Sequence, residues 1–234
     1  MNLAVLGDSG RFPLSLVCLE RSLKYWLKIK HINDIAMQDV LTDHCATFMG
    51  NNKSWGNLIK QKLDSLGFSN LWENQNLNLN MFPSIQRRVR DIYIQEWHTA
   101  INNSPKLKSY VMFKENFEFE PYLDYIHNNN LRMHLTRFRI SSHSLAIESG
   151  RFNNIDRNNR LCIFCNQNSV ESEYHFLLVC QKYNNIRSKF IKHHPWPTMN
   201  RFKNLLSSKN RNVQLSIAKY IKNATEERQK SFEM

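Results

Sequence analysis

Hydrophobic residues recur at helical spacing along most of this chain. The clearest pattern lies between residues 85 and 101, where apolar side chains are mostly three or four residues apart: Ile85, Val89, Ile92, Tyr93, Trp97, Ala100 and Ile101. Residues at this spacing share one face of an α-helix, so the pattern predicts an amphipathic helix. Similar stripes predict a helix from about 14 to 30 and a last helix from about 213 to 224. Strand-like alternation is scarce, so we expect a mainly α fold of several helices.

Local signals predict where other helices begin and end. Ser54 precedes a short apolar stripe and Gly67 follows it, which is typical of an N-cap and a C-terminal stop. Shorter helices are expected over 107–117 and after Pro121.

The segment from 131 to 145 also has helical spacing. As one helix, it would place Arg132, Arg139 and His143 together on a face away from the apolar stripe, with Arg137 off that line.

Three cysteines and one histidine form a cluster in the last third of the chain, with the spacing Cys162-x2-Cys165-x9-His175-x4-Cys180. A Cys-x2-Cys pair fits a tight turn that places both sulfurs on one side of an ion. Four protein ligands with no open position are typical of a structural zinc site, and sulfur ligands argue against magnesium or calcium. The alternatives are a packed, metal-free set of small residues beside a buried histidine, or an iron–sulfur site, which usually uses four thiolates.

The second half of this motif sets a geometric problem. On an ideal α-helix, two residues five apart differ in direction by about 140°. If His175 and Cys180 bind one ion, we expect either a helix that begins at His175 and unwinds near Cys180, or a turn.

The chain carries a net charge of +12, and the excess is local. Residues 131–225 hold 16 Lys and Arg against 4 Asp and Glu, whereas residues 1–130 hold 14 against 13. A basic region of this kind favours a polyanionic partner, most plausibly a nucleic acid, over the alternative of a basic surface without a partner. The predicted phosphate contacts flank the cysteine cluster: Arg132, Arg137, Arg139, Arg151, Arg157, Arg160, Lys182, Arg187 and Lys189.

Aromatic side chains beside the cluster have two interpretations. Phe152, Phe164 and Tyr183 could stack on unpaired bases of a single strand. The alternative is that they fill a small hydrophobic core.

We predict four regions from these features and from the Asn-rich stretch 74–80, which is typical of a connector. They are an N-terminal helical region (1–80), a central helical region (81–150), a zinc-binding module (151–195) and a C-terminal helical segment (196–234).

The cysteine count predicts a reducing compartment. The chain has five cysteines, of which Cys18 and Cys45 lie apart from the cluster on apolar stretches, and this favours a metal site over a disulfide framework. Residues 1–11 lack a basic segment, and the longest strongly apolar uncharged run is 12–19. We therefore expect no signal peptide, no membrane span and an intracellular location, in the nucleus or the cytoplasm.

The segments Cys162-Ile-Phe-Cys165 and Glu173-Tyr-His175-Phe-Leu-Leu-x-Cys180 resemble the C-terminal zinc-binding segment of reverse transcriptase polyproteins from non-LTR retrotransposons. Further similar stretches are Gly10-Arg-Phe-Pro-Leu14, Leu66-Gly-Phe68 with Trp72, Gln95-Glu-Trp-His98, Leu135-Thr-Arg-Phe-Arg139 and Ser141-Ser-His143. The resemblance implies a region that lies downstream of the polymerase core and helps to grip template RNA or target DNA. The upstream polymerase core would then be a second partner.

Catalytic groups of such polyproteins are missing from this sequence. It contains no Asp-Asp pair, and the closest string, Tyr122-Leu-Asp-Tyr125, has one carboxylate where two-metal chemistry needs a cluster. After Cys180 only three acidic residues follow, Glu226, Glu227 and Glu233, which argues against a carboxylate-metal nuclease.

A thiol nucleophile is the remaining catalytic possibility. Cys18, or Cys45 with His44, could be proposed for this role, but no third group orients them. We therefore predict a zinc-stabilised nucleic-acid-binding fragment that is not an enzyme. The alternatives are a zinc-braced helical protein-interaction module and an inactive retroelement relict.

Overall fold

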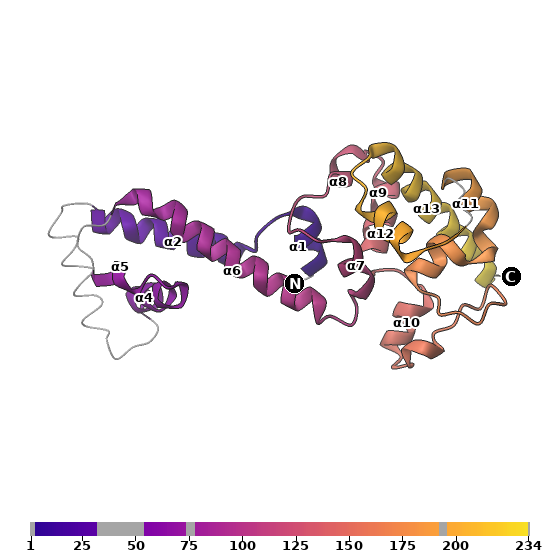
Figure 1. Cartoon of the computed structure of the whole chain (residues 1–234), viewed down its shortest axis with the longest axis horizontal. Coiled ribbons are helices and arrows are strands. Elements are labelled where there is room, and N and C mark those ends of the chain that lie inside the picture. The colour runs from indigo at the N-terminus through magenta and orange to yellow at the C-terminus, as the bar shows by residue number, and fades with distance from the viewer. Residues whose placement is uncertain (1–2, 32–53, 74–77, 192–195, 234) are drawn as a thin grey trace. The chain divides into compact units, whose positions relative to one another are not determined.

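The protein is mainly α-helical (Figure 1). The computed structural model describes residues 3–31, 54–73, 78–191 and 196–233. Within these residues no β-strand forms, and two isolated bridges, Ser9 with Phe119 and Leu161 with Val170, are the β-type pairings. The chain folds as two compact units, one of residues 12–98 and one of residues 1–11 with 99–234. The four-region division predicted above stays a prediction.

The unit of residues 12–98 is built from α2, α4, α5, the short 3₁₀ helix η1 and most of α6. Their bounds are Leu14–His31, Trp55–Leu66, Ser69–Glu73, Leu79–Met81 and Phe82–Asn102. Its core brings together apolar side chains of the helical stripes, among them Leu23, Trp26, Leu63 and Ile85. The predicted ends of α4 are confirmed, because the Ser54 hydroxyl accepts a hydrogen bond from the Asn57 backbone N–H at 3.3 Å and Gly67 adopts a φ of +82°.

The second unit carries the cysteine cluster. Its described α-helices, besides the end of α6, are α1 (Leu3–Ser9), α7 (Lys108–Phe113), α8 (Tyr122–Tyr125), α9 (Asn129–Arg139), α10 (Ala146–Phe152), α11 (Asn184–Phe190), α12 (Met199–Ser207) and α13 (Arg211–Glu233). Single turns η2 (Arg157–Asn159), η3 (His175–Val179) and η4 (Gln181–Tyr183) lie between α10 and α11. The C-terminal helix α13 packs against α8, α9, α11 and α12, and thereby forms the centre of this unit (Figure 1).

The strongest helical patterns are confirmed as helices, namely α2, α4, α6 and α13. The shorter predicted helices are also present as α7 and α8, although α7 ends at Phe113. The predicted connector lies partly outside the described residues.

The single helix predicted over 131–145 is wrong. Helix α9 ends at Arg139, and the backbone of Ser141 takes a left-handed φ of +50°. The N–H of Ser142 donates to the Arg137 carbonyl at 2.7 Å and the N–H of Ser141 donates to the Phe138 carbonyl at 3.3 Å. These two bonds form a Schellman motif that ends the helix without the usual glycine. His143 therefore lies in the loop after α9.

Arg139 of α9 lies inside the protein with 1% of its surface exposed. Its guanidinium donates to both carboxylate oxygens of Asp8, at 2.9 and 3.2 Å, and it also pairs with Glu120 at 3.1 Å. The hydroxyls of Tyr110 and Tyr122 donate to the same Asp8 carboxylate, each at 3.0 Å. We call Asp8, Tyr110, Glu120, Tyr122 and Arg139 the Asp8–Arg139 centre.

Candidate metal centre

A short hairpin positions the first two cysteines. Its arms meet at the Leu161–Val170 bridge, and the N–H of Cys162 donates to the Ser169 carbonyl at 2.9 Å. Asn168 takes a φ of +47°, a left-handed conformation that asparagine tolerates better than most residues. The hairpin therefore holds Cys162 and Cys165 close together in the loop that this bridge closes.

A π-helical turn positions the other two residues. Residues His175–Val179 form η3, and the N–H of Cys180 donates to the His175 carbonyl at 2.8 Å. This is an i to i+5 bond, which is wider than the turn of an α-helix. It places two residues that are five apart on the same side of the turn. On an α-helix, the same two residues would differ in direction by about 140° and could not easily bind one ion.

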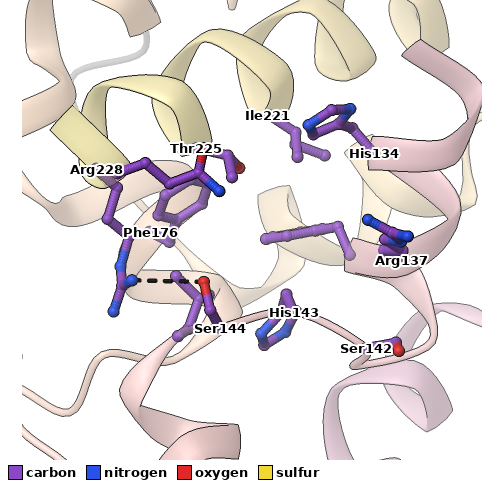
Figure 2. A pocket seen from close by; sticks show the side chains of 12 residues that line it. His134, Arg137, Ser142, His143, Ser144, Phe176, Ile221, Thr225 and Arg228 are labelled. Carbon is purple, nitrogen blue, oxygen red and sulfur yellow. Dashed lines mark hydrogen bonds between the residues drawn. The ribbon is translucent and has the colours of Figure 1, made fainter. Parts of the chain in front are cut away.

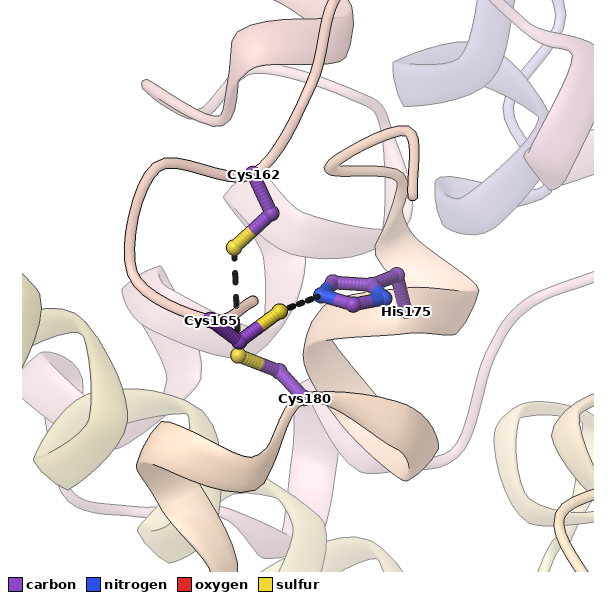
Figure 3. A group of neighbouring side chains, drawn as sticks. All are labelled: Cys162, Cys165, His175 and Cys180. Carbon is purple, nitrogen blue, oxygen red and sulfur yellow. Dashed lines mark hydrogen bonds between the residues drawn. The ribbon is translucent and has the colours of Figure 1, made fainter. Parts of the chain in front are cut away.

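The four side chains converge on one point (Figure 3). Their donor atoms all lie within 4.8 Å of one another, with 3.9 Å between Cys162 Sγ and Cys180 Sγ and 3.4 Å between Cys165 Sγ and His175 Nε2. Around a tetrahedral zinc ion, bond lengths of about 2.3 Å to sulfur and about 2.0 Å to nitrogen separate the ligand atoms by about 3.5 to 3.8 Å. The donor set and the spacing fit a single ion, so this Cys3His cluster could hold a metal.

The protonation of the cluster also suits metal binding. Cys162 and Cys180 share a hydrogen bond, which lowers the pKa of Cys162 and raises the pKa of Cys180. Burial of both side chains opposes the first shift and adds to the second. The lowered pKa of Cys162 favours its thiolate, the form that binds metals. His175 presents Nε2 to the sulfurs, and its buried Nδ1 has no hydrogen-bond partner within the described residues.

A buried glutamate fixes the start of the π turn. Glu173 accepts hydrogen bonds from the hydroxyls of Ser109 and Ser141, at 2.7 and 2.8 Å, and from His143 Nε2 at 3.1 Å. Burial alone would raise the pKa of Glu173, but these donors, His143 first, lower it to about 2. The charged carboxylate thus ties the segment just before His175 to α7 and to the loop after α9.

An arginine satisfies the carbonyl oxygens that the π turn leaves open. Arg187 of α11 donates to the carbonyls of Leu177 and Cys180, each at 2.9 Å. The Tyr220 hydroxyl of α13 donates to the Phe176 carbonyl at 2.5 Å. Arg187 and Tyr220 therefore hold the turn that carries two of the four candidate ligands.

A second buried ion pair holds the hairpin. Glu171 accepts two hydrogen bonds from Arg228 of α13, each at 2.8 Å, and one from the Ala146 backbone N–H at 2.6 Å. The sequence pattern predicts neither Glu171 nor Arg228 as a site residue, and Glu173 enters only through the resemblance to a known family. The two glutamates could have been recognised from the sequence, because they lie beside a candidate ligand in a strongly basic region.

The prediction that Arg139 contacts phosphates is wrong, because this side chain is buried in the Asp8–Arg139 centre. Three other predicted contacts, Arg132, Arg160 and Arg187, donate to backbone carbonyl oxygens and brace loops. These acceptors are backbone carbonyl groups, which every residue type carries. Counting charges along a sequence does not detect such contacts.

The remaining predicted contacts lie on the surface. Arg151 pairs with Glu148 at 3.0 Å and Lys182 pairs with Glu227 at 3.5 Å. The last three have side chains with no ion pair or hydrogen bond to other described residues: Arg137, Arg157 and Lys189. We call these three the unpaired basic residues.

The aromatic residues considered for base stacking differ in accessibility. Phe152 is 72% exposed, and the Arg151 guanidinium lies 4.4 Å from its ring centroid. Phe164 packs edge-on against Phe232 at 5.1 Å. Tyr183 is 1% exposed and packs against the ring of Phe176, so it belongs to the core.

Cys18 is not part of the cluster. Cys18 is exposed and forms no disulfide, and Cys45 and His44 lie outside the described residues. No helix in the described ranges combines the length and the apolar character that crossing a membrane requires. Comparison of the chain with protein-family models, curated proteins and solved structures found no match.

Proposed function

We propose that this chain is a zinc-stabilised nucleic-acid-binding fragment without a catalytic site of its own. The observation that carries the proposal is the convergence of Cys162, Cys165, His175 and Cys180 within the part of the chain that holds the charge excess. Sulfur and imidazole ligands suit zinc, and a full set of four protein ligands suits a structural ion. The zinc ion would hold the hairpin against the π turn and supply folding free energy.

The nucleic acid is proposed as partner from the charge of the same region. The unpaired basic residues Arg137, Arg157 and Lys189 are not neutralised by described acidic side chains. Contacts from such residues to phosphates would be salt-dependent and would carry little sequence information. The resemblance to the region downstream of a retrotransposon polymerase core supports the same partner, and we propose with it an intracellular location beside that core.

A titration with single-stranded RNA over a salt series tests this function. The triple variant Arg137→Gln, Arg157→Gln and Lys189→Gln should weaken binding and reduce the slope of log affinity against log salt by about two, since each lost phosphate contact removes about 0.7. The matched control replaces three exposed basic residues of the other unit, Lys60→Gln, Arg87→Gln and Arg88→Gln, with the same loss of charge.

The control variant should keep the wild-type slope. Absence of RNA binding by the wild-type chain at low salt would reject the proposed function, as would equal effects of the two triple variants.

A zinc-braced protein-interaction module is the second candidate. The observation that favours it is that most predicted phosphate contacts have partners within the protein, among them Arg139, Arg160 and Arg187. A shallow salt slope in the same titration would support this candidate.

A further inference from the structure

A pocket opens between α9, the loop after it and α13, and Arg137 is the one lining residue that the sequence predicts as part of a site (Figure 2). Its volume is about 320 Å³, within the range of small-molecule pockets, which starts near 300 Å³. Four buried apolar side chains contribute to its wall: Phe138, Leu145, Phe176 and Ile221. An organic group of moderate size would find an apolar surface there.

Among the described residues, the polar part of the wall contains donors and no carboxylate. Its side chains are two arginines, two histidines, three hydroxyl groups and one amide, and no Asp or Glu is among them. Arg228 is neutralised by Glu171, and His143 Nε2 donates to Glu173. Arg137 is the exception, because its exposed guanidinium forms no ion pair within the described residues.

Hydroxyl groups line the pocket on both sides. Figure 2 shows Arg137 and Ser142 on one side of the pocket and Thr225 and Arg228 on the other, with His143 between them. Arg228 donates to the Ser144 hydroxyl at 3.5 Å, which leaves the proton of that hydroxyl free to donate. A guanidinium and hydroxyl groups that line one pocket can form several hydrogen bonds with a tetrahedral oxyanion, and those of the guanidinium are charge-assisted.

We propose that this pocket binds the phosphate group of a nucleotide, with the Arg137 guanidinium on the phosphate and the apolar wall against the sugar or the base. The proposal rests on the nucleic-acid-binding function proposed above for its class of ligand, and it adds the group that is recognised and the residue that recognises it. A free nucleotide and the 5′-phosphate end of a strand carry the same chemistry. An inorganic anion would use the guanidinium but not the apolar wall.

Isothermal titration of the full chain with adenosine 5′-monophosphate and with adenosine tests the role of the phosphate. We expect saturable binding of the monophosphate and at least about tenfold weaker binding of adenosine, because charge-assisted hydrogen bonds are lost. The variant Arg137→Ala should weaken binding of the monophosphate by about tenfold or more. The control Arg211→Ala removes an exposed arginine of α13 that does not line the pocket, and it should leave the affinity unchanged.

A second titration separates the two sources of the phosphate. The titration compares an RNA oligonucleotide that carries a 5′-phosphate with the same strand that carries a 5′-hydroxyl. Tighter binding of the 5′-phosphate strand, if Arg137→Ala abolishes the difference, assigns the pocket to strand ends. Equal binding of the two strands, together with binding of the free monophosphate, assigns it to free nucleotides.

Two results would contradict the proposal that the pocket binds a nucleotide phosphate. One is the absence of monophosphate binding by a wild-type chain that does bind RNA, and this leaves the proposed function intact. The other is an equal effect of Arg137→Ala and Arg211→Ala. Conversely, the chain could bind the monophosphate through Arg137 and not bind RNA. This result would reject the proposed function and support the proposed phosphate site.

Discussion

Two buried polar centres lie in the same unit of this protein, and they are held together in different ways. In the Asp8–Arg139 centre, opposite charges and strong donors satisfy one another: Arg139 pairs with Asp8 and Glu120, and both tyrosines donate to Asp8. In the cysteine cluster, the contacts are two sulfur-containing pairs of 3.9 and 3.4 Å. Sulfur is a weak donor and a weak acceptor, so these contacts contribute little by themselves.

This contrast indicates which centre depends on an added ion. The Asp8–Arg139 centre is complete as a set of hydrogen bonds, and its stability comes from the protein alone. The cysteine cluster gathers four metal-binding groups whose mutual attraction is weak, while Glu173, Arg187 and Arg228 hold the surrounding backbone. We therefore expect metal removal to affect the second centre and to spare the first.

Metal removal should produce the greatest change. A strong chelator, or the variant Cys162→Ser, should unfold the region from about 151 to 191, because a structural zinc contributes about 10 kcal/mol or more in small modules. Amide hydrogen exchange should lose protection there, while α6 around Trp97 keeps its protection.

The control for this prediction is Cys18→Ser, which replaces an exposed cysteine outside the cluster. It should leave the exchange pattern unchanged. Unchanged circular dichroism and exchange after treatment with the chelator would show that the region does not depend on a metal.

The second effect concerns the other centre. Arg139→Met leaves the Asp8 carboxylate buried without its cation, and such a change destabilises a protein by about 3 to 5 kcal/mol. Urea unfolding should show this loss, whereas the metal content of the folded protein should stay at the wild-type value. The control is Arg211→Met on the surface, which should be nearly neutral. A variant Arg139→Met that unfolds at the wild-type urea concentration would show that the ion pair is not needed.

A smaller effect is expected from the support of the π turn. Arg187→Met removes the donors to the carbonyls of Leu177 and Cys180, next to the cluster. Loss of such outer contacts typically lowers metal affinity by about 10- to 100-fold. Competition with a zinc chelator measures this change. Lys189→Met, two residues further on the same helix, is the control, and equal affinities of both variants would argue against a role of Arg187.

The weakest effect lies outside both centres. Ser54→Ala removes the N-cap of α4 in the other unit and should cost about 1 kcal/mol of that unit's stability. Thermal unfolding measures the loss, and the metal content should not change. A loss of metal in this variant would show that the cluster depends on more than its own surroundings.

Much of the fold follows from the sequence. Helical spacing predicts α2, α6 and α13, because one apolar stripe per helix determines which face is buried. Ser54 and Gly67 mark α4 because their local conformations differ from that of a helix. The four residues of the cysteine cluster are likewise found from their spacing, since a hairpin and one turn suffice to bring them together.

The remaining features depend on tertiary contacts. Arg139 is buried because Asp8, 131 residues earlier in the chain, lies against it. After α9 the chain turns at Ser141 in a left-handed conformation that serine rarely adopts, so no glycine marks the end of the helix. The pocket beside Arg137 needs α13 as its second wall, and a linear pattern carries no information about that pairing.

X-ray absorption at the zinc edge of the purified chain is the decisive measurement for the cysteine cluster. We predict one zinc ion per chain with three sulfur ligands at about 2.3 Å and one nitrogen ligand at about 2.0 to 2.1 Å. A protein that folds without bound metal, or a metal surrounded by oxygen ligands, would refute the zinc-braced cluster.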